Sequence, residues 1–199
     1  MSRRDVFDVA VVGAGMVGSA CALGLARRGL RVVLVEEREP PPWRADDEVD
    51  LRVVALAPSS IDFLGQIGVW DAIAAARISP YRRMHVWGAA NGAALDFDAA
   101  DRGEAELGFI VENRLIQHAL WQGLEADSSI ERCCPARVVA TIADGALRTL
   151  ELADGTRLAA RLVLAADGAN SPLRELAGIT TRGRDYGQRA IVAHVATGR

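Results

Sequence analysis

Asp8-Val-Ala-Val-Val-Gly13-Ala-Gly15-Met-Val-Gly18 is the stretch that decides the fold, and Glu36 completes it at the end of the next apolar run. The order of strand, glycine turn, helix, strand and acid is typical of the βαβ unit that binds dinucleotides. We predict that Gly13 allows a tight turn, that Gly15 leaves room for a pyrophosphate, and that Gly18 lets the helix pack closely on the strand. Glu36 would accept hydrogen bonds from the hydroxyls of an adenosine ribose.

The flanking sequence supplies the context that a bare glycine motif lacks. An apolar strand is predicted at 7–12, a Gly/Ala/Leu-rich helix at 16–28 and a second strand at 30–35. Gly29 falls where the helix should end. The alternative is a buried βαβ unit whose glycines serve only the turns.

Composition bounds the class of protein. The chain has 199 residues, 50% of them hydrophobic, and a formal net charge of −3 with its basic residues scattered. Nucleic-acid binding needs a clustered basic face, so we expect no nucleic-acid partner. The sequence shows no apolar stretch long enough to span a bilayer and no cleavable apolar leader. We therefore expect a cytoplasmic protein, and a peripheral contact with the inner membrane stays open.

Cysteine and histidine residues give little indication of a metal or redox site. The three cysteines are Cys21, Cys133 and Cys134, and they show neither a disulfide framework nor a C-x-x-C spacing. Cys133 and Cys134 are neighbours in a predicted strand, so their side chains should point to opposite faces. A redox role is the less favoured reading. The three histidines lie far apart, and we expect no metal site.

Downstream of Glu36 the sequence departs from an ordinary nicotinamide dehydrogenase, because a polar, proline-rich loop follows at 39–50. A near-continuous apolar run at 162–166 predicts a strand that is buried on both faces. The other predicted elements are a helix through Gln66 capped by Ser59 or Ser60, strands at 83–87 and 94–97 around the turn Asn91-Gly92, a strand at 107–111, a helix opened by Glu112-Asn113, a β-meander over 130–164, a short helix at 172–177 and a strand at 186–196.

Three further segments join the glycine motif and Glu36 in a recognisable order. They are Asp50-Leu-Arg52-Val-Val-Ala-Leu-Ala-Pro-Ser59, Glu112-Asn113-Arg114-Leu-Ile-Gln117-His-Ala-Leu, and Ala166-Asp167-Gly168-Ala-Asn-Ser171-Pro-Leu-Arg174 followed by Tyr186-Gly187-Gln188. Together the segments resemble the flavin-dependent aromatic hydroxylases of the para-hydroxybenzoate hydroxylase type, and among them the ubiquinone-biosynthesis (UbiH-like) hydroxylases. The resemblance covers essentially the whole chain.

The resemblance implies FAD as cofactor and NAD(P)H as co-substrate. It places Arg52, Arg114 and Gln117 near the ribityl chain and pyrophosphate of the flavin, and it gives Asp167, with Gly168, a part in the use of FAD and NAD(P)H. Guanidinium groups suit phosphates and amides suit sugar hydroxyls. Three alternatives stay open: a surface ion pair for Arg52, a solvated helix position for Gln117 and a plain turn at Asp167-Gly168.

These observations predict an α/β protein. We expect a Rossmann-like, three-layer domain that binds FAD or NAD(P), with strands 7–12, 31–35 and 162–166 in one parallel sheet, and part of a β-rich substrate domain. The predicted divisions are an FAD-binding βαβ region at 1–82, a β-rich segment of the substrate domain at 83–111, the rest of the FAD-binding domain at 112–182, and the start of a truncated substrate-domain sheet at 183–199.

By the same resemblance, the whole protein hydroxylates a small aromatic substrate, a polyprenyl phenol on the path to ubiquinone. No side chain is expected to be catalytic, because the flavin carries the difficult chemistry. Two rivals remain. One is a reductase or oxidase of the same fold that acts on an isoprenoid or another small molecule, and the other is a non-catalytic binding module in a biosynthetic complex.

The chain is shorter than members of that family, which carry a later Gly-Asp motif that is missing here. We therefore expect an N-terminal part of a longer protein, which binds FAD weakly or not at all and has no hydroxylase activity. The exposed edge of the strand at 186–196 would pair with a second copy, so we expect a homo-oligomer.

Overall fold

The computed structural model describes residues 6–88 and 92–196. The chain divides into two compact units. Unit 1 comprises Met1–Pro42 and Gln117–Arg199, and unit 2 comprises Trp43–Ile116. The boundary between them falls within helix α4, Asn113–Ala126.

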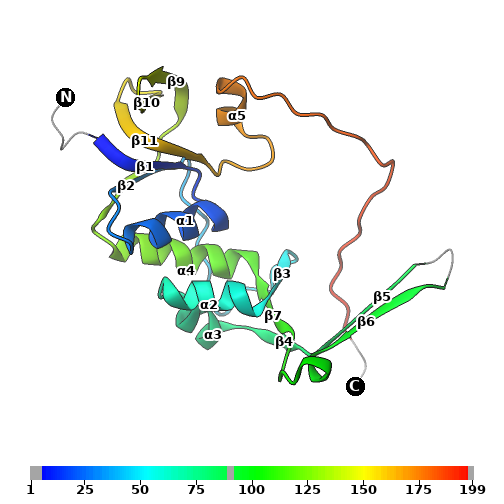
Figure 1. The fold of residues 1–199 in the computed structure, drawn as a ribbon. Coiled ribbons are helices and arrows are strands. Elements are labelled where there is room, and N and C mark those ends of the chain that lie inside the picture. Colours follow the sequence, from blue (N-terminus) through cyan, green and yellow to red (C-terminus); the bar gives the residue numbers. More distant parts are fainter. Residues whose placement is uncertain (1–5, 89–91, 197–199) are drawn as a thin grey trace. The chain divides into compact units, whose positions relative to one another are not determined.

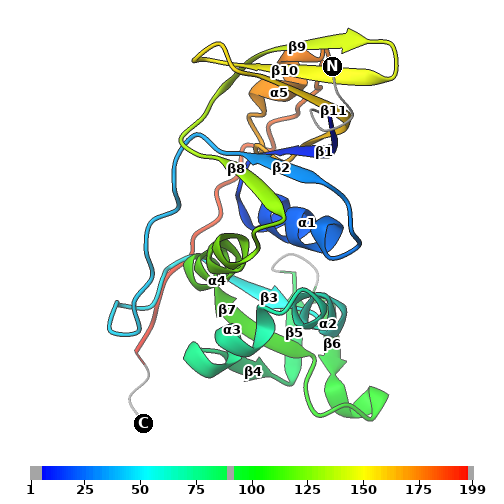
Figure 2. The same ribbon diagram turned by 90° about the vertical axis from the view of Figure 1, so that its left-hand side faces the viewer.

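Unit 1 is built on a six-stranded sheet with the strand order β8-β2-β1-β11-β10-β9, and Figures 1 and 2 together show these strands. Neighbouring strands among β8, β2, β1 and β11 are parallel, and β10 and β9 continue the sheet in antiparallel fashion. The predicted parallel placement of 7–12, 31–35 and 162–166 in one sheet is confirmed. The strands are β1 (Val6–Val12), β2 (Val32–Val35), β8 (Ile130–Cys133), β9 (Val138–Asp144), β10 (Leu147–Leu152) and β11 (Arg157–Ala165).

Two helices cover this sheet on opposite sides, as Figures 1 and 2 show. Helix α1, Met16–Ala26, packs against β1, β2 and β8, and helix α5, Pro172–Leu176, packs against β9. All four residues of β2 are buried, as expected for a central parallel strand. Gly29, at φ +78°, turns the chain out of α1 toward β2. The Rossmann-like α/β fold predicted from the glycine motif is confirmed.

Unit 2 contains a three-stranded antiparallel sheet, β3-β7-β4, and a separate hairpin of β5 and β6. The predicted strands at 83–87 and 94–97 pair with each other, while Asn91 of the predicted turn lies outside the described residues. The elements are β3 (Val53–Leu56), α2 (Pro58–Gln66), α3 (Trp70–Ala76), β4 (Ser79–Tyr81), β5 (Arg83–Trp87), β6 (Ala94–Asp98), a 3-10 helix (Ala99–Arg102) and β7 (Gly108–Glu112).

Helix α2 begins differently from the prediction. Ala57 is its N-cap residue, and Pro58 occupies the first helical turn without any side-chain cap. Ser59 and Ser60 therefore lie inside the helix, and the prediction that one of them caps it is wrong. Proline suits this position because it has no N–H to leave unpaired, and its fixed φ is already helical.

The predicted meander over 130–164 is only partly correct. Strands β9, β10 and β11 form an antiparallel meander, but β8 pairs in parallel with β2 at the edge of the sheet. Helix α4, which precedes β8, provides the crossover that a parallel strand requires. Alternating apolar residues look alike in both kinds of pairing, so the local pattern did not separate β8 from the strands after it.

Two predictions about the later strands are wrong. Residues 162–166 are not buried on both faces, since Leu162 is 51% exposed and belongs to the long strand β11. Residues 186–196 form no strand in the described chain, and Ile191 there is 92% exposed. Strand preference reflects packing against neighbours, and apolar composition alone does not create it. Within the described residues, no helix is both long enough and apolar enough to cross a membrane.

Candidate functional site

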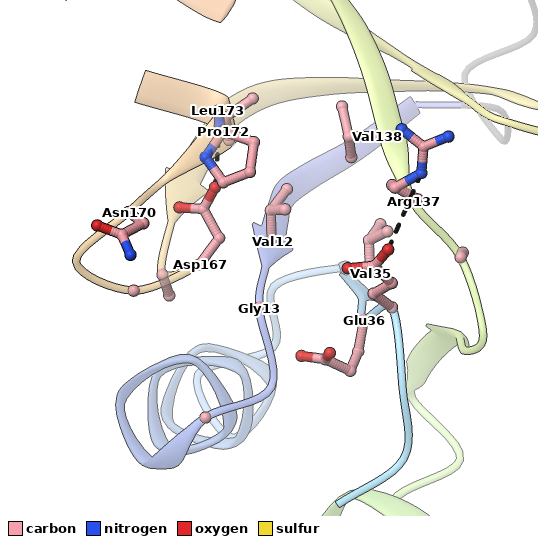
Figure 3. A pocket seen from close by; sticks show the side chains of 15 residues that line it. Val12, Gly13, Val35, Glu36, Arg137, Val138, Asp167, Asn170, Pro172 and Leu173 are labelled. Carbon is pink, nitrogen blue, oxygen red and sulfur yellow. Dashed lines mark hydrogen bonds and ion pairs between the residues drawn. The ribbon is translucent and has the colours of Figure 1, made fainter. Parts of the chain in front are cut away.

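A cleft of about 540 Å³ opens at the carboxyl ends of the central parallel strands of unit 1 (Figure 3). Ligands bind to α/β sheets at this edge. The cleft brings together five of the predicted site residues, Gly13, Gly15, Glu36, Asp167 and Gly168. The other lining residues are Val12, Val35, Glu37, Ala136, Arg137, Val138, Ala166, Asn170, Pro172 and Leu173.

Gly13 and Gly18 are glycines because the backbone of the protein leaves no space for a side chain. A Cβ atom at Gly13 would lie 2.4 Å from the carbonyl oxygen of Ala166, and one at Gly18 would lie 1.9 Å from the carbonyl oxygen of Gly13. Gly13 also adopts φ +101°, which side chains of L-residues disfavour. Gly13 therefore lets the loop turn sharply beside the end of β11, and Gly18 lets α1 pack closely against that loop.

Gly15 differs from both of these glycines. A Cβ atom there would meet no protein atom within 4 Å, and its backbone, at φ −64° and ψ 177°, is open to any residue. Gly15 precedes α1, whose N-terminus no side chain caps. The N–H groups of the first turn and the positive end of the helix dipole therefore suit an anion. The space in front of Gly15 fits a group that approaches the backbone closely, such as a pyrophosphate.

Glu36 is held beside the glycine loop. Its Oε2 atom accepts a hydrogen bond from the Ala14 N–H at 2.5 Å, and its Oε1 atom accepts one from the Arg38 N–H at 3.1 Å. Its backbone N–H donates to Cys133 at 2.9 Å, and its carbonyl accepts from Ala136 at 2.8 Å. A carboxylate has about four lone-pair sites, so it retains acceptor capacity for the hydroxyls of a ligand.

Two side chains also hold the glycine loop through the carbonyl oxygen of Ala14. This oxygen accepts hydrogen bonds from the Ser19 hydroxyl at 3.0 Å and from the Gln117 amide at 3.4 Å. Gln117 thus supports the glycine loop, while its predicted contact with the flavin stays a prediction. Ser19 is fully buried, and sequence reasoning missed it. The available signal was a small polar residue directly after the glycine motif.

Asp167 organises the loop after β11. Its Oδ1 atom accepts a hydrogen bond from the Ser171 hydroxyl at 2.5 Å, and its Oδ2 atom accepts one from the Leu173 N–H at 2.9 Å. Ser171 in turn caps α5 by accepting from the Arg174 N–H at 3.0 Å. Gly168 permits the turn with φ +91°. The carboxylate therefore shapes one wall of the cleft as well as facing it (Figure 3).

Arg137 lies on the opposite wall of the cleft from Asp167 (Figure 3). Its side chain is 60% exposed, and its Nε atom lies 3.9 Å from Oε1 of Glu37. At this distance and exposure the ion pair contributes little, so the guanidinium is available to a ligand. Sequence reasoning missed Arg137, because it stands outside every motif and reaches the cleft through the pairing of distant strands.

Arg52 and Arg114, the two arginines of the prediction, belong to unit 2. The Arg52 N–H donates to the Asp50 carboxylate at 3.1 Å, and its carbonyl accepts from the Asn113 N–H at 3.0 Å. The Arg114 guanidinium forms an ion pair with Asp47 at 3.5 Å. Their contact with the flavin stays a prediction.

The cysteines are all free thiols. Burial raises the pKa of the Cys133 thiol, with Glu131 and Asp154 adding to the effect. Burial also raises the pKa of Cys134, with a further contribution from Glu36. A protonated thiol is a poor nucleophile, which counts against a redox role. Among the described residues, no group of His, Cys, Asp and Glu side chains is arranged to hold a metal ion.

Comparison with protein families matches residues 6–197 to the family described as FAD binding domain. The chain belongs to this family. This FAD-binding domain is 42% identical over 188 residues to 3-demethoxyubiquinol 3-hydroxylase of Escherichia coli (strain K12), covering 94% of the chain and 48% of the relative. It is 37% identical over 202 residues to the mitochondrial ubiquinone biosynthesis monooxygenase COQ6 of Xenopus tropicalis, covering 94% and 43%.

A third relative is the ubiquinone hydroxylase UbiL of Rhodospirillum rubrum, 35% identical over 194 residues, with 98% of the chain and 44% of the relative covered. The chain thus spans about half the length of the curated relatives it matches. The resemblance to ubiquinone-biosynthesis hydroxylases, drawn from four motifs, is confirmed.

Solved structures agree with the fold. PqsL of Pseudomonas aeruginosa, a probable FAD-dependent monooxygenase, superposes with a TM-score of 0.71 at 24% identity, covering 91% of this chain and 48% of PqsL. The p-nitrophenol 4-monooxygenase PnpA of Pseudomonas putida DLL-E4 gives a TM-score of 0.71 at 24% identity, with 90% and 46% covered. The FAD-binding domain therefore has the fold of these proteins.

Proposed function

We propose that the whole protein is an FAD-dependent, NAD(P)H-using monooxygenase that hydroxylates an aromatic ring, with a polyprenyl phenol of ubiquinone biosynthesis as its substrate. The observation that carries the proposal is the cleft, where the open backbone at Gly15 and the carboxylates of Glu36 and Asp167 line one volume. The names of the sequence relatives support the reaction and the substrate class.

The residues of the cleft suit distinct parts of FAD. The N-terminus of α1 and the space at Gly15 suit the pyrophosphate, and the Glu36 carboxylate suits the hydroxyls of the adenosine ribose. When bound, FAD supplies the redox chemistry that takes electrons from NAD(P)H and activates dioxygen. The part of the protein is to bind and orient the cofactor and to exclude water. We assign Arg52, Arg114 and Gln117 to the same cofactor by resemblance.

The test uses the protein at its full natural length. An absorbance spectrum of the purified protein should show bound flavin, and the released flavin should be FAD. NAD(P)H consumption should depend on a polyprenyl phenol, and labelled dioxygen should place one labelled oxygen in each product molecule. NAD(P)H consumption without oxygen incorporation favours a reductase or oxidase, and the absence of bound flavin favours a binding module.

Partners and location follow from the substrate. A polyprenyl phenol resides in the membrane, so we infer a cytoplasmic protein that binds the inner membrane peripherally and associates with other enzymes of the pathway. We also infer a homo-oligomer, although the strand at 186–196 that motivated it is not formed. Support now comes from exposed apolar residues in that segment, of which Ile191 and Val195 are examples. Vesicle flotation and light scattering test the two inferences separately.

A further inference from the structure

Glu112 is a buried acid of unit 2 to which the proposed function gives no role. It ends β7, and its side chain is only 4% exposed. Three donors satisfy its carboxylate: the Arg77 guanidinium at 2.9 Å, the Trp43 indole N–H at 3.3 Å and the Asp50 backbone N–H at 3.3 Å. Because the carboxylate is buried and binds one cationic and two neutral donors, it restrains the chain segments that carry these donors.

Arg77 holds the same loop at a third point. It follows α3, and its Nη1 and Nη2 atoms both donate to the carbonyl oxygen of Asp47 at 3.2 Å. Its guanidinium carbon also lies 5.5 Å from the centre of the Trp43 ring. Glu112 and Arg77 together therefore restrain the segment 43–50 at its start, middle and end.

This segment precedes Arg52 in the chain and contacts Arg114, the two arginines that the resemblance assigns to the flavin. Asp50 donates its own N–H to Glu112, and its carboxylate accepts a hydrogen bond from the Arg52 N–H at 3.1 Å. The Asp47 carboxylate forms the ion pair with Arg114 at 3.5 Å. Asn113, next to Glu112, donates its N–H to the Arg52 carbonyl at 3.0 Å. The backbone of Arg52 and the guanidinium of Arg114 thus depend on the position of this loop.

We propose that Glu112 and Arg77 are positioning residues, which hold residues 43–52 in the conformation that presents Arg52 and Arg114 to the pyrophosphate and ribityl chain of FAD. The inference rests on the proposed function. Neither residue needs to touch the cofactor, because each acts through the loop. Arg83 and Asp98 offer a contrast in the same unit, since they form an ion pair at 2.6 Å in which the Arg83 side chain is 82% exposed.

The experiment measures FAD affinity of the full-length apoprotein by fluorescence titration. The variants are Glu112→Gln, which weakens the pair with Arg77; Arg77→Lys, which loses the paired bonds to Asp47; and Trp43→Phe, which removes one donor but keeps the ring. Each should weaken FAD binding by roughly 3- to 30-fold, the range for residues that act through an intermediate element. The control Arg83→Lys should change it by about twofold or less.

Double variants separate positioning from general stability. The fold-decrease in FAD affinity of the double variant Glu112→Gln/Arg52→Met should be smaller than the product of the fold-decreases of the two single variants, because both substitutions act through Arg52. Glu112→Gln combined with Glu36→Ala should show the simple product of the two losses. A merely structural role would lower the melting temperature while leaving FAD affinity of the folded protein at the level of Arg83→Lys.

The outcomes distinguish this inference from the proposed function. If the wild-type protein binds no FAD, or if Arg52→Met binds it normally, the site assignment fails and the inference fails with it. If the wild-type protein binds FAD and Arg52→Met weakens that binding, but the three variants bind FAD as Arg83→Lys does, only the inference is overturned. Should Glu112→Gln not fold, Arg77→Lys and Trp43→Phe decide by the same criterion.

Discussion

The glycine loop after β1 and the Asp167 loop after β11 lie at neighbouring strand ends but are built by opposite means. The glycine loop depends on missing side chains, since a Cβ at Gly13 or Gly18 would collide with backbone atoms. The Asp167 loop depends on a side chain, whose carboxylate accepts bonds from Ser171 and Leu173. Gly15 fits neither description, because the fold leaves its Cβ position open. Gly13 and Gly18 are therefore required by the fold, whereas the fold gives no reason for a glycine at position 15.

The largest effect is expected at the positions where the backbone fills the space. Gly18→Ala places a Cβ 1.9 Å from the Gly13 carbonyl oxygen, which rigid backbone on both sides cannot relieve. We predict a loss of more than about 4 kcal/mol in the free energy of unfolding, or no soluble protein. Chemical denaturation followed by circular dichroism measures it.

The matched control is Gly65→Ala. Gly65 lies in α2 with no atom within 4 Å of its Cβ position, so alanine there should stabilise the protein by about 0.5–1 kcal/mol through helix propensity. A Gly18→Ala variant as stable as the Gly65→Ala variant would show that the glycine loop does not pack as described.

The Asp167 loop should respond less strongly. Asp167→Ala removes the acceptor of the Ser171 hydroxyl and of the Leu173 N–H, so α5 loses the support of its N-terminus. We predict a loss of about 1–3 kcal/mol in the free energy of unfolding. Asp154→Ala, which removes an exposed acceptor of the Thr156 N–H, should cost less. Equal losses in the two variants would contradict the part that Asp167 plays in holding α5.

Glu36→Ala should lower the affinity for the cofactor, and it also removes the acceptor of the Ala14 and Arg38 N–H groups. Glu36→Ala leaves ribose hydroxyls without acceptors, which should weaken FAD binding by about 1–3 kcal/mol. Titration of the full-length apoprotein with FAD measures this loss. Glu39→Ala is the nearby control, since Glu39 is exposed and does not line the cleft. FAD affinity that falls equally in both variants would remove the specific assignment to Glu36.

The parallel core and much of the cleft could be predicted because their signals are local. Three glycines at fixed spacing, a buried β2 and an acid at its end specify the βαβ unit without knowledge of distant residues. Asp167 could be placed beside the cleft because it follows a strand of the same sheet. Its bonds to Ser171 and Leu173 depend on how the following loop closes, which the motif does not state.

Long-range pairing explains what was missed. The parallel pairing of β8 with β2 brings Cys133 and Ala136 to the backbone of Glu36, and it carries Arg137 to the cleft wall. No local pattern distinguishes this pairing from a continued meander. The segment 186–196 shows the converse case, since its apolar and β-branched residues predict a strand but no neighbouring strand pairs with it among the described residues.

We propose that the open space at Gly15 serves a ligand and not the fold, and the Gly15→Val variant separates the two requirements. In the full-length apoprotein, the free energy of unfolding of Gly15→Val should stay within about 1 kcal/mol of that of the wild-type apoprotein, because a Cβ at this position has no atom beyond its chain neighbours within 4 Å. FAD binding should be abolished, because the side chain occupies the space in front of the N-terminus of α1. Folded Gly15→Val protein that carries a stoichiometric amount of FAD would show that the cofactor does not occupy the space at Gly15.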